Sequence, residues 1–163
     1  MSQDTIFALA SGVGRAAVAI IRLSGPTVKS CLTSLIGAVP DPRQAVLKTL
    51  RVKGEAIDQA LVLFFPAPHS FTGEDVAELQ IHGSQAVISR LLSELGHFPH
   101  CRMAEAGEFS RRAMLNGKMD LAHIEGLIDL IDSETELQRK QALRQMQGML
   151  SGQVATWRRS LLQ

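Results

Sequence analysis

The sequence predicts an α+β fold, a five-stranded mixed sheet with about three helices, followed by a helical segment. Up to Lys118, short stretches that alternate apolar and polar residues are separated by stretches with helical periodicity. From Asp120 onward, apolar residues recur at steps of three and four, which is the helical period. Strand pairs with interspersed helices are typical of the α+β class. The 163 residues therefore divide into an amino-terminal domain, residues 1–118, and the beginning of a truncated helical domain, residues 119–163.

The five expected strands are bounded by turns rich in glycine and proline. Gly12–Arg15 separates the first two strands, Lys53–Glu55 separates the third from the fourth, and Pro66 ends the fourth. In chain order the strands are Thr5–Ala10, Ala17–Ser24, Ala45–Val52, Ile57–Phe65 and Val76–His82.

The three expected helices carry start or stop signals. The first, Pro26–Ile36, begins with a proline, which is favoured in the first turn. Ser84 caps the second helix, which ends at Gly96. The third, Glu108–Leu115, is closed by Asn116-Gly117, a pair suited to the left-handed conformation that stops helices.

Two charged residues lie within the expected strands. Glu78 lies halfway along the strand 76–82, on the side that alternation also gives to Gln80 and His82. A carboxylate there is costly if it is dry and unpaired, so it should meet a protein cation, water or a ligand with N–H donors. Arg22 shares a strand face with Val18 and departs from the apolar alternation. An internal Arg22–Glu78 salt bridge is therefore one reading of both residues.

Lys118 lies in a turn between two expected helices. Asp120 is suited to cap the next helix, with Met119 and Ile124 as the flanking hydrophobic staple. A lysine held between two helices in this way has a defined direction.

The helical segment carries apolar and acidic stripes. Glu125, Asp129, Asp132 and Glu136 advance by four, three and four; we interpret them as a solvated face in preference to a metal or partner site. The chain stops without a helix stop signal, so we interpret it as a fragment. A long helix near the end carries an apolar stripe formed by Leu143, Met146, Leu150, Val154, Trp157 and Leu161.

Composition indicates a soluble, cytoplasmic protein. Lysine plus arginine is 17 against 16 acidic residues, so no overall basic field indicates nucleic-acid binding. No signal peptide and no apolar run of membrane-spanning length occurs. Cys31 and Cys101 lack CxxC spacing and are expected to be buried free thiols, and the five histidines form no ligand pair, so we expect no bound metal.

One motif in the chain is misleading. Residues 12–17 match G-x-G-x-x-A, the dinucleotide fingerprint of redox enzymes. The residues that follow form a strand pattern where a helix should begin, and the expected acidic residue about twenty positions later is missing. We therefore reject this interpretation.

Four segments resemble the amino-terminal part of the TrmE/MnmE family of tRNA-modification GTPases, and the resemblance covers nearly the whole chain. The most specific is GEFSRRAMLNGKMDLA, which begins at Gly107. The others are SFTGEDVAELQIH at Ser70–His82, GRAAVAIIRLSG at Gly14–Gly25 and DLIDSETE at Asp129–Glu136.

The resemblance implies a tRNA-modifying enzyme for the intact protein. With a flavin-dependent partner protein, such an enzyme adds a carboxymethylaminomethyl-type group at the wobble uridine of certain tRNAs and hydrolyses GTP. Potassium and magnesium would serve the GTPase domain, and tRNA would be contacted mainly by parts outside this chain. The chain has no G-x-x-x-x-G-K-[ST] motif, so this fragment alone is not expected to hydrolyse GTP and carries no catalytic residues.

For this part, the resemblance implies a homodimer that binds 5-formyltetrahydrofolate through Arg22, Glu78 and Lys118. One carboxylate can accept the amino group and ring N–H of a pterin together, while the folate carboxylates and formyl oxygen suit Arg or Lys. Two other function classes stand beside this one. They are a purely structural dimerisation module without ligand and a free-standing aminomethyltransferase, which would need a much longer chain to enclose folate.

Overall fold

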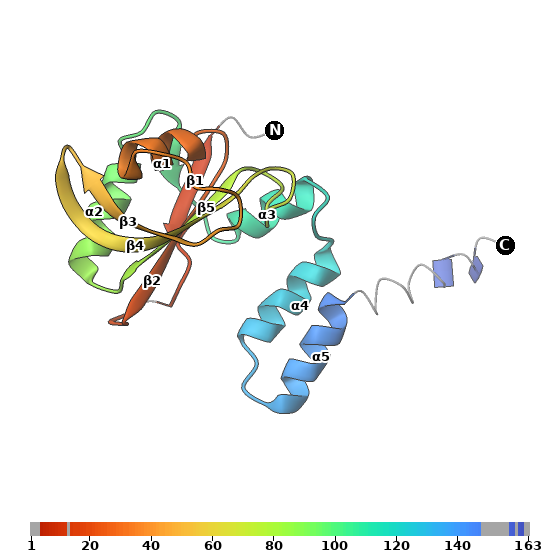
Figure 1. Ribbon diagram of the computed structural model, residues 1–163. Coiled ribbons are helices and arrows are strands. Elements are labelled where there is room, and N and C mark those ends of the chain that lie inside the picture. The colour runs from red at the N-terminus through yellow and green to blue at the C-terminus, as the bar shows by residue number, and fades with distance from the viewer. Residues whose placement is uncertain (1–3, 13, 148–156, 159, 162–163) are drawn as a thin grey trace. The chain divides into compact units, whose positions relative to one another are not determined.

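A computed structural model describes residues 4–12, 14–147, 157–158 and 160–161 of the chain. It divides into two compact units, residues 1–112 and 113–163. Six strands and five helices are present among the described residues (Figure 1).

The first unit contains one mixed sheet with strand order β3-β4-β5-β2-β1-β6. Neighbouring strands are antiparallel except β1 and β6, which are parallel. The strands are β1 Thr5–Leu9, β2 Val18–Ser24, β3 Val46–Val52, β4 Glu55–Phe65, β5 Val76–His82 and β6 Cys101–Met103.

The prediction of five strands was wrong by one, because it missed β6. This strand has three residues and pairs with β1 at the edge of the sheet, with Thr5 opposite Cys101. Three residues are too few for the apolar alternation on which a sequence-based prediction depends. The predicted three-residue turn before β4 is also shorter. Lys53 and Gly54 both have positive φ, as a two-residue hairpin turn requires, and Glu55 already belongs to β4.

Three helices follow the predicted order before Lys118. They are α1 Val28–Ile36, α2 Gln85–Leu95 and α3 Glu108–Leu115. Ser84 is the residue before α2, as predicted, but its side chain makes no capping hydrogen bond. The boundary between the two units falls within α3, after Arg112.

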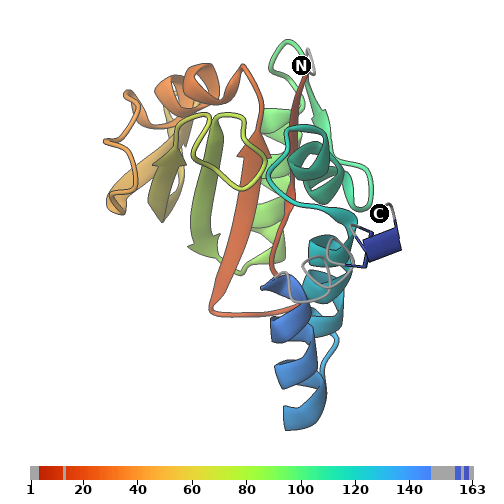
Figure 2. The ribbon, with the colours of Figure 1, turned by 90° about the vertical axis from the view of Figure 1, so that its right-hand side faces the viewer.

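Helices α1 and α2 cover one face of the sheet, and the core lies between them and the strands. Figure 2 shows α2 behind the sheet, and the loop between β4 and β5 in front of it. Ile21 and Leu23 of β2 and Leu79 of β5 point into this core and are fully buried. Alternation therefore turns Arg22 and Glu78 toward the opposite face.

The second unit contains α4 Leu121–Ile131 and α5 Glu136–Met146. Asp120 caps α4 as predicted, because its side chain accepts a hydrogen bond from the His123 N–H. The helical segment is not continuous, however. Asp132 is the carboxyl-terminal cap of α4, and Glu136 is the first residue of α5. The predicted acidic stripe is therefore divided between two helices. Thr135 begins the second helix with a capping box. Leu150 and Val154 of the predicted apolar stripe lie outside the described residues.

A network of ion pairs around the buried Arg112 and Glu108 stabilises the edge of the sheet formed by β1 and β6. Arg112, 5% exposed, contacts Asp4, Glu74 and Glu108 at 3.0, 3.1 and 3.1 Å. The Glu108 carboxylate also receives two hydrogen bonds from Arg102, at 2.6 and 2.8 Å. These bonds from Arg102 outweigh burial and lower the pKa of Glu108 to about 2 from its ordinary 4.5.

We expect the stability of the first unit to depend on Glu108 and on pH. Because the folded pKa of Glu108 is depressed, its stabilisation is complete above the unfolded pKa of 4.5 and is lost as the pH falls toward 2. Glu108→Gln should lower the free energy of unfolding at pH 7 by roughly 3 kcal/mol. It should also flatten the decline of that free energy with falling pH. Urea unfolding over a pH series measures both effects.

The control is Glu105→Gln, which changes a carboxylate that is 69% exposed and lies three residues earlier. This variant should follow the wild-type pH dependence. A Glu108→Gln protein with the wild-type slope below pH 5 would contradict the assignment.

Candidate functional site

A row of half-buried side chains crosses four strands on the face opposite α1 and α2. Ala8 of β1 is opposite Arg22 of β2, Arg22 is opposite Glu78 of β5, and Glu78 is opposite Leu63 of β4. Directly opposed residues in antiparallel strands point to the same face, so the register alone places these four side chains side by side. Figure 2 shows these strands side by side in the sheet.

Arg22 and Glu78 form the charged centre of this row. The Arg22 Nε and Nη2 groups donate to the same oxygen, Glu78 Oε1, at 3.0 and 2.7 Å. The side chains are 26% and 19% exposed. Within the described part of the chain, Glu78 Oε2 and Arg22 Nη1 have no hydrogen-bond partner. The pair therefore leaves one acceptor and one donor available to a ligand.

Two aromatic rings contact the Arg22 guanidinium. Its central carbon lies 5.1 Å from the centre of the Phe71 ring and 5.8 Å from that of Phe109, within the range of cation–π attraction. Phe71 belongs to the loop between β4 and β5, and Phe109 to the first turn of α3. Sequence reasoning missed both. The available signal was a phenylalanine inside an otherwise polar or glycine-containing segment, SFTGED in one case and GEFSRR in the other.

This arrangement can recognise a ligand, and it offers little for covalent catalysis. A planar group that carries adjacent N–H donors could bind to the free carboxylate oxygen, and an oxyanion or carbonyl could accept from Arg22. The neighbouring Ala8 and Leu63 supply apolar contact. No serine, cysteine or histidine lies in the cross-strand row itself.

Lys118 belongs to the second unit and is exposed. Its backbone N–H donates to the Ala113 carbonyl at 2.8 Å, and the preceding Gly117 has a φ of 68°. The predicted turn with a left-handed glycine is therefore present. Arg22 and Glu78 are brought together within the first unit, and Lys118 comes from the other unit.

A second polar pair lies on the same sheet. The Asp58 carboxylate contacts the His82 ring nitrogen at 2.7 Å and accepts the His82 backbone N–H at 2.8 Å. Burial raises the pKa of Asp58, but the hydrogen bonds from His82 outweigh it and the net pKa is lowered. His82 also lines a shallow trough of about 400 Å³ together with Val18 and Leu61.

The two cysteines are free, with their sulfur atoms 3.8 Å apart; Cys31 is buried as expected, and Cys101 is only partly buried. Burial raises the pKa of both thiols above its ordinary value. A thiol with a raised pKa is a weak nucleophile at neutral pH.

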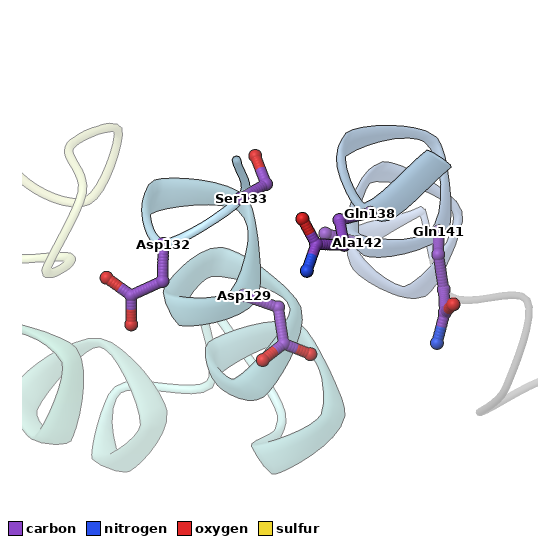
Figure 3. Close-up of a pocket in the computed structure, with 6 residues that line it drawn as sticks. All are labelled: Asp129, Asp132, Ser133, Gln138, Gln141 and Ala142. Carbon is purple, nitrogen blue, oxygen red and sulfur yellow. The ribbon is translucent and has the colours of Figure 1, made fainter. Parts of the chain in front are cut away.

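A pocket of about 200 Å³ lies between α4 and α5 in the second unit (Figure 3). Its carboxylates, Asp129 and Asp132, do not converge on a common point in this view. Among the described residues, no three or more histidine, cysteine or acidic side chains are grouped so that they could hold a metal ion. None of the helices in this part of the chain has the length and hydrophobicity that a membrane span requires.

Comparison with known proteins gives a consistent match. The sequence-family model described as the amino terminus of the GTP-binding protein TrmE matches residues 5–118. The tRNA modification GTPase MnmE of Beijerinckia indica subsp. indica is 58% identical over 162 residues, covering 98% of this chain and 36% of the relative. The MnmE of Roseobacter denitrificans is 53% identical over 161 residues, which cover 98% of this chain and 38% of the relative. The MnmE of Methylobacterium radiotolerans is 56% identical over 157 residues, which cover 95% of this chain and 36% of the relative. The chain thus spans a little over a third of the length of these relatives.

Proposed function

The chain belongs to the TrmE family of GTP-binding proteins, and on this premise we propose that it is the cofactor-binding, dimer-forming part of a tRNA-modification GTPase. Its ligand is 5-formyltetrahydrofolate, held at Arg22 and Glu78. The observation that carries the proposal is the half-buried Arg22–Glu78 pair, which has one free acceptor, one free donor and two aromatic neighbours.

The chemistry of a pterin suits this pair. Its amino group and ring N–H need a carboxylate, which Glu78 provides through Oε2, while Oε1 keeps its two hydrogen bonds from Arg22. Arg22 then serves the formyl oxygen or a carboxylate of the folate tail, and Lys118 serves a tail carboxylate. A charge-assisted pair of this kind discriminates strongly against ligands that lack the N–H groups.

The alternative is a structural dimerisation module in which the ion pair only stabilises the sheet. Partly exposed ion pairs contribute about 0–1 kcal/mol to stability. This small gain does not account for a charged Arg22 at a position where an apolar residue would fit the alternation of its strand. The ligand-binding proposal explains both the charge and the unused atoms.

In the intact protein, this part would supply a one-carbon unit for the modification of the wobble uridine of certain tRNAs. The reaction would need a flavin-dependent partner protein and a GTPase domain that uses potassium and magnesium. The names of the relatives, which are tRNA modification GTPases, support this reading.

The first unit also has a surface suited to self-association. Val18, Leu47 and Leu61, which line the trough, are 53%, 64% and 42% exposed. Grouped apolar residues at such exposure are costly in water and are commonly covered by a second chain. They support a homodimer formed by the first unit.

We expect Glu78→Gln to weaken binding of 5-formyltetrahydrofolate at least about tenfold, because the amide replaces one acceptor by a donor and the charge is lost. Isothermal titration calorimetry measures the affinity. The matched control is Glu55→Gln, since Glu55 is exposed beside the β3–β4 turn. Equal affinity of wild type and Glu78→Gln, with equal stability, would refute the role of Glu78.

Replacement of Lys118 should affect the ligand more than the fold. Because the side chain is exposed, Lys118→Ala should leave the melting temperature nearly unchanged and lower the affinity roughly two- to fivefold. Lys140→Ala, which changes an exposed lysine on α5, is the control. A Lys118→Ala protein that unfolds readily would show that the lysine is structural.

Truncation of the chain can show whether the first unit or the helical segment is responsible for self-association. We expect the chain to be a dimer at high micromolar concentration, and light scattering measures its mass. Removal of residues 138–163 deletes the exposed Leu143, Trp157 and Leu161. A dimer that survives the deletion belongs to the first unit, one that is lost belongs to the helical segment, and a monomeric full chain contradicts both sources.

A further inference from the structure

The loop that carries Phe71 is tied to β2 through a buried chain of hydroxyl groups. The Ser24 Oγ lies 2.7 Å from the Thr72 Oγ1 and donates to Glu74 Oε2 at 2.6 Å. The Glu74 N–H donates to Thr72 Oγ1 at 3.3 Å, which closes the loop on itself. Ser24 and Thr72 are fully buried. A hydrogen bond between two dry hydroxyls is costly to break, so the loop has a defined position.

The same network holds the helix that carries Phe109. Arg112 lies three residues after Phe109, and thus on nearly the same side of α3. Its guanidinium donates to both Glu74 oxygens, at 3.2 and 3.1 Å, and to the Asp4 carbonyl at 2.9 Å. The Glu74 carboxylate is therefore the point at which the loop and the helix are joined.

Each ring that contacts Arg22 is thus adjacent to a member of the network. Phe71 immediately precedes Thr72, and Phe109 is one helical turn before Arg112. The rings in turn restrict the guanidinium, since cation–π attraction favours the position in which Arg22 contacts both of them. A side chain restrained before binding loses less conformational entropy when its ligand binds.

We infer that Ser24, Thr72, Glu74 and Arg112 are positioning residues for the Arg22 site. The network sets the places of Phe71 and Phe109, and through these rings the direction in which Arg22 presents its free Nη1. The inference uses the proposed folate ligand for its binding test, and its structural part is independent of that ligand.

The test uses Thr72→Val, because valine keeps the shape of threonine and removes only the hydroxyl. The matched control is Thr33→Val on α1, whose hydroxyl donates to the Lys29 carbonyl and is exposed. If Thr72→Val lowers the yield of folded protein, Glu74→Gln replaces it, since the amide keeps the size of the side chain and changes only its contacts with Ser24 and Arg112.

The first measurement is the Nε–Hε signal of Arg22 in an NMR correlation spectrum, assigned with Arg22→Gln. The Phe71 and Phe109 rings should displace this signal from the position of an exposed arginine, because both lie over the guanidinium. Thr72→Val and Phe71→Leu should each move the signal toward that position, and Thr33→Val should not. An Arg22 signal that responds to Phe71→Leu but is unmoved by Thr72→Val overturns the inference.

The second measurement is the affinity for 5-formyltetrahydrofolate in a double-mutant cycle. Thr72→Val should weaken binding about two- to tenfold in the wild type. It should have little further effect when Phe71 is already leucine, because both changes then remove one coupled contribution. If the double variant loses affinity by the product of the two single losses, Thr72 acts independently of Phe71, and the inference is overturned.

The two measurements separate this inference from the proposed function. A wild-type protein that fails to bind the folate overturns the proposed ligand, while the Arg22 signal still decides whether the network positions the rings.

Discussion

The pairing of β2 with β5 is the constraint on which the rest of the first unit depends. In the observed register Arg22 is opposite Glu78, and the flanking Ile21, Leu23 and Leu79 face the core. A slip of one residue in either strand would turn a charge into the core and expose leucine or isoleucine to solvent. The apolar face and the charged pair therefore select the same register, and the site follows from the way in which the core is packed.

The elements around this pair are held in place by a network of ion pairs and hydrogen bonds. A buried network around Arg112 joins the amino terminus, the β4–β5 loop and the start of α3 through Asp4, Glu74 and Glu108. Such a fully hydrogen-bonded network resists rearrangement, because removal of one partner leaves a buried charge unpaired. The two rings that contact Arg22 lie on the elements that this network joins.

Sequence patterns predicted the parts of the fold that are long or carry explicit signals. The bounds of β5 and α3 were predicted correctly, since seven alternating residues and a helix closed by Asn116-Gly117 leave little choice. The strand β6 was missed because three residues show no period. The helical segment was predicted without its break, since the Thr135 capping box interrupts a pattern that still reads as helical in its apolar spacing.

Only part of the candidate site could be predicted from the sequence. Arg22 stood out because it departs from the apolar alternation of its strand, and Glu78 because a carboxylate halfway along a strand needs a partner. Their direct opposition requires knowledge of strand order. Phe71 and Phe109 could not be found in this way, because an aromatic residue in a loop or on a short helix is compatible with many kinds of contact. Their shared role depends on two segments, 70–75 and 105–112, that meet only in the folded chain.

If the sheet face around the ion pair binds 5-formyltetrahydrofolate, as proposed, an NMR titration of methyl-labelled protein with this ligand will detect the contact. The methyl signals of Ala8 and Leu63, which flank the pair in the cross-strand row, should shift with added ligand. Those of Leu32 and Leu91, buried on the helix-covered face, should remain in place. No shift, or shifts confined to the helix-covered face or to residues 113–163, would show that this sheet face does not bind the folate.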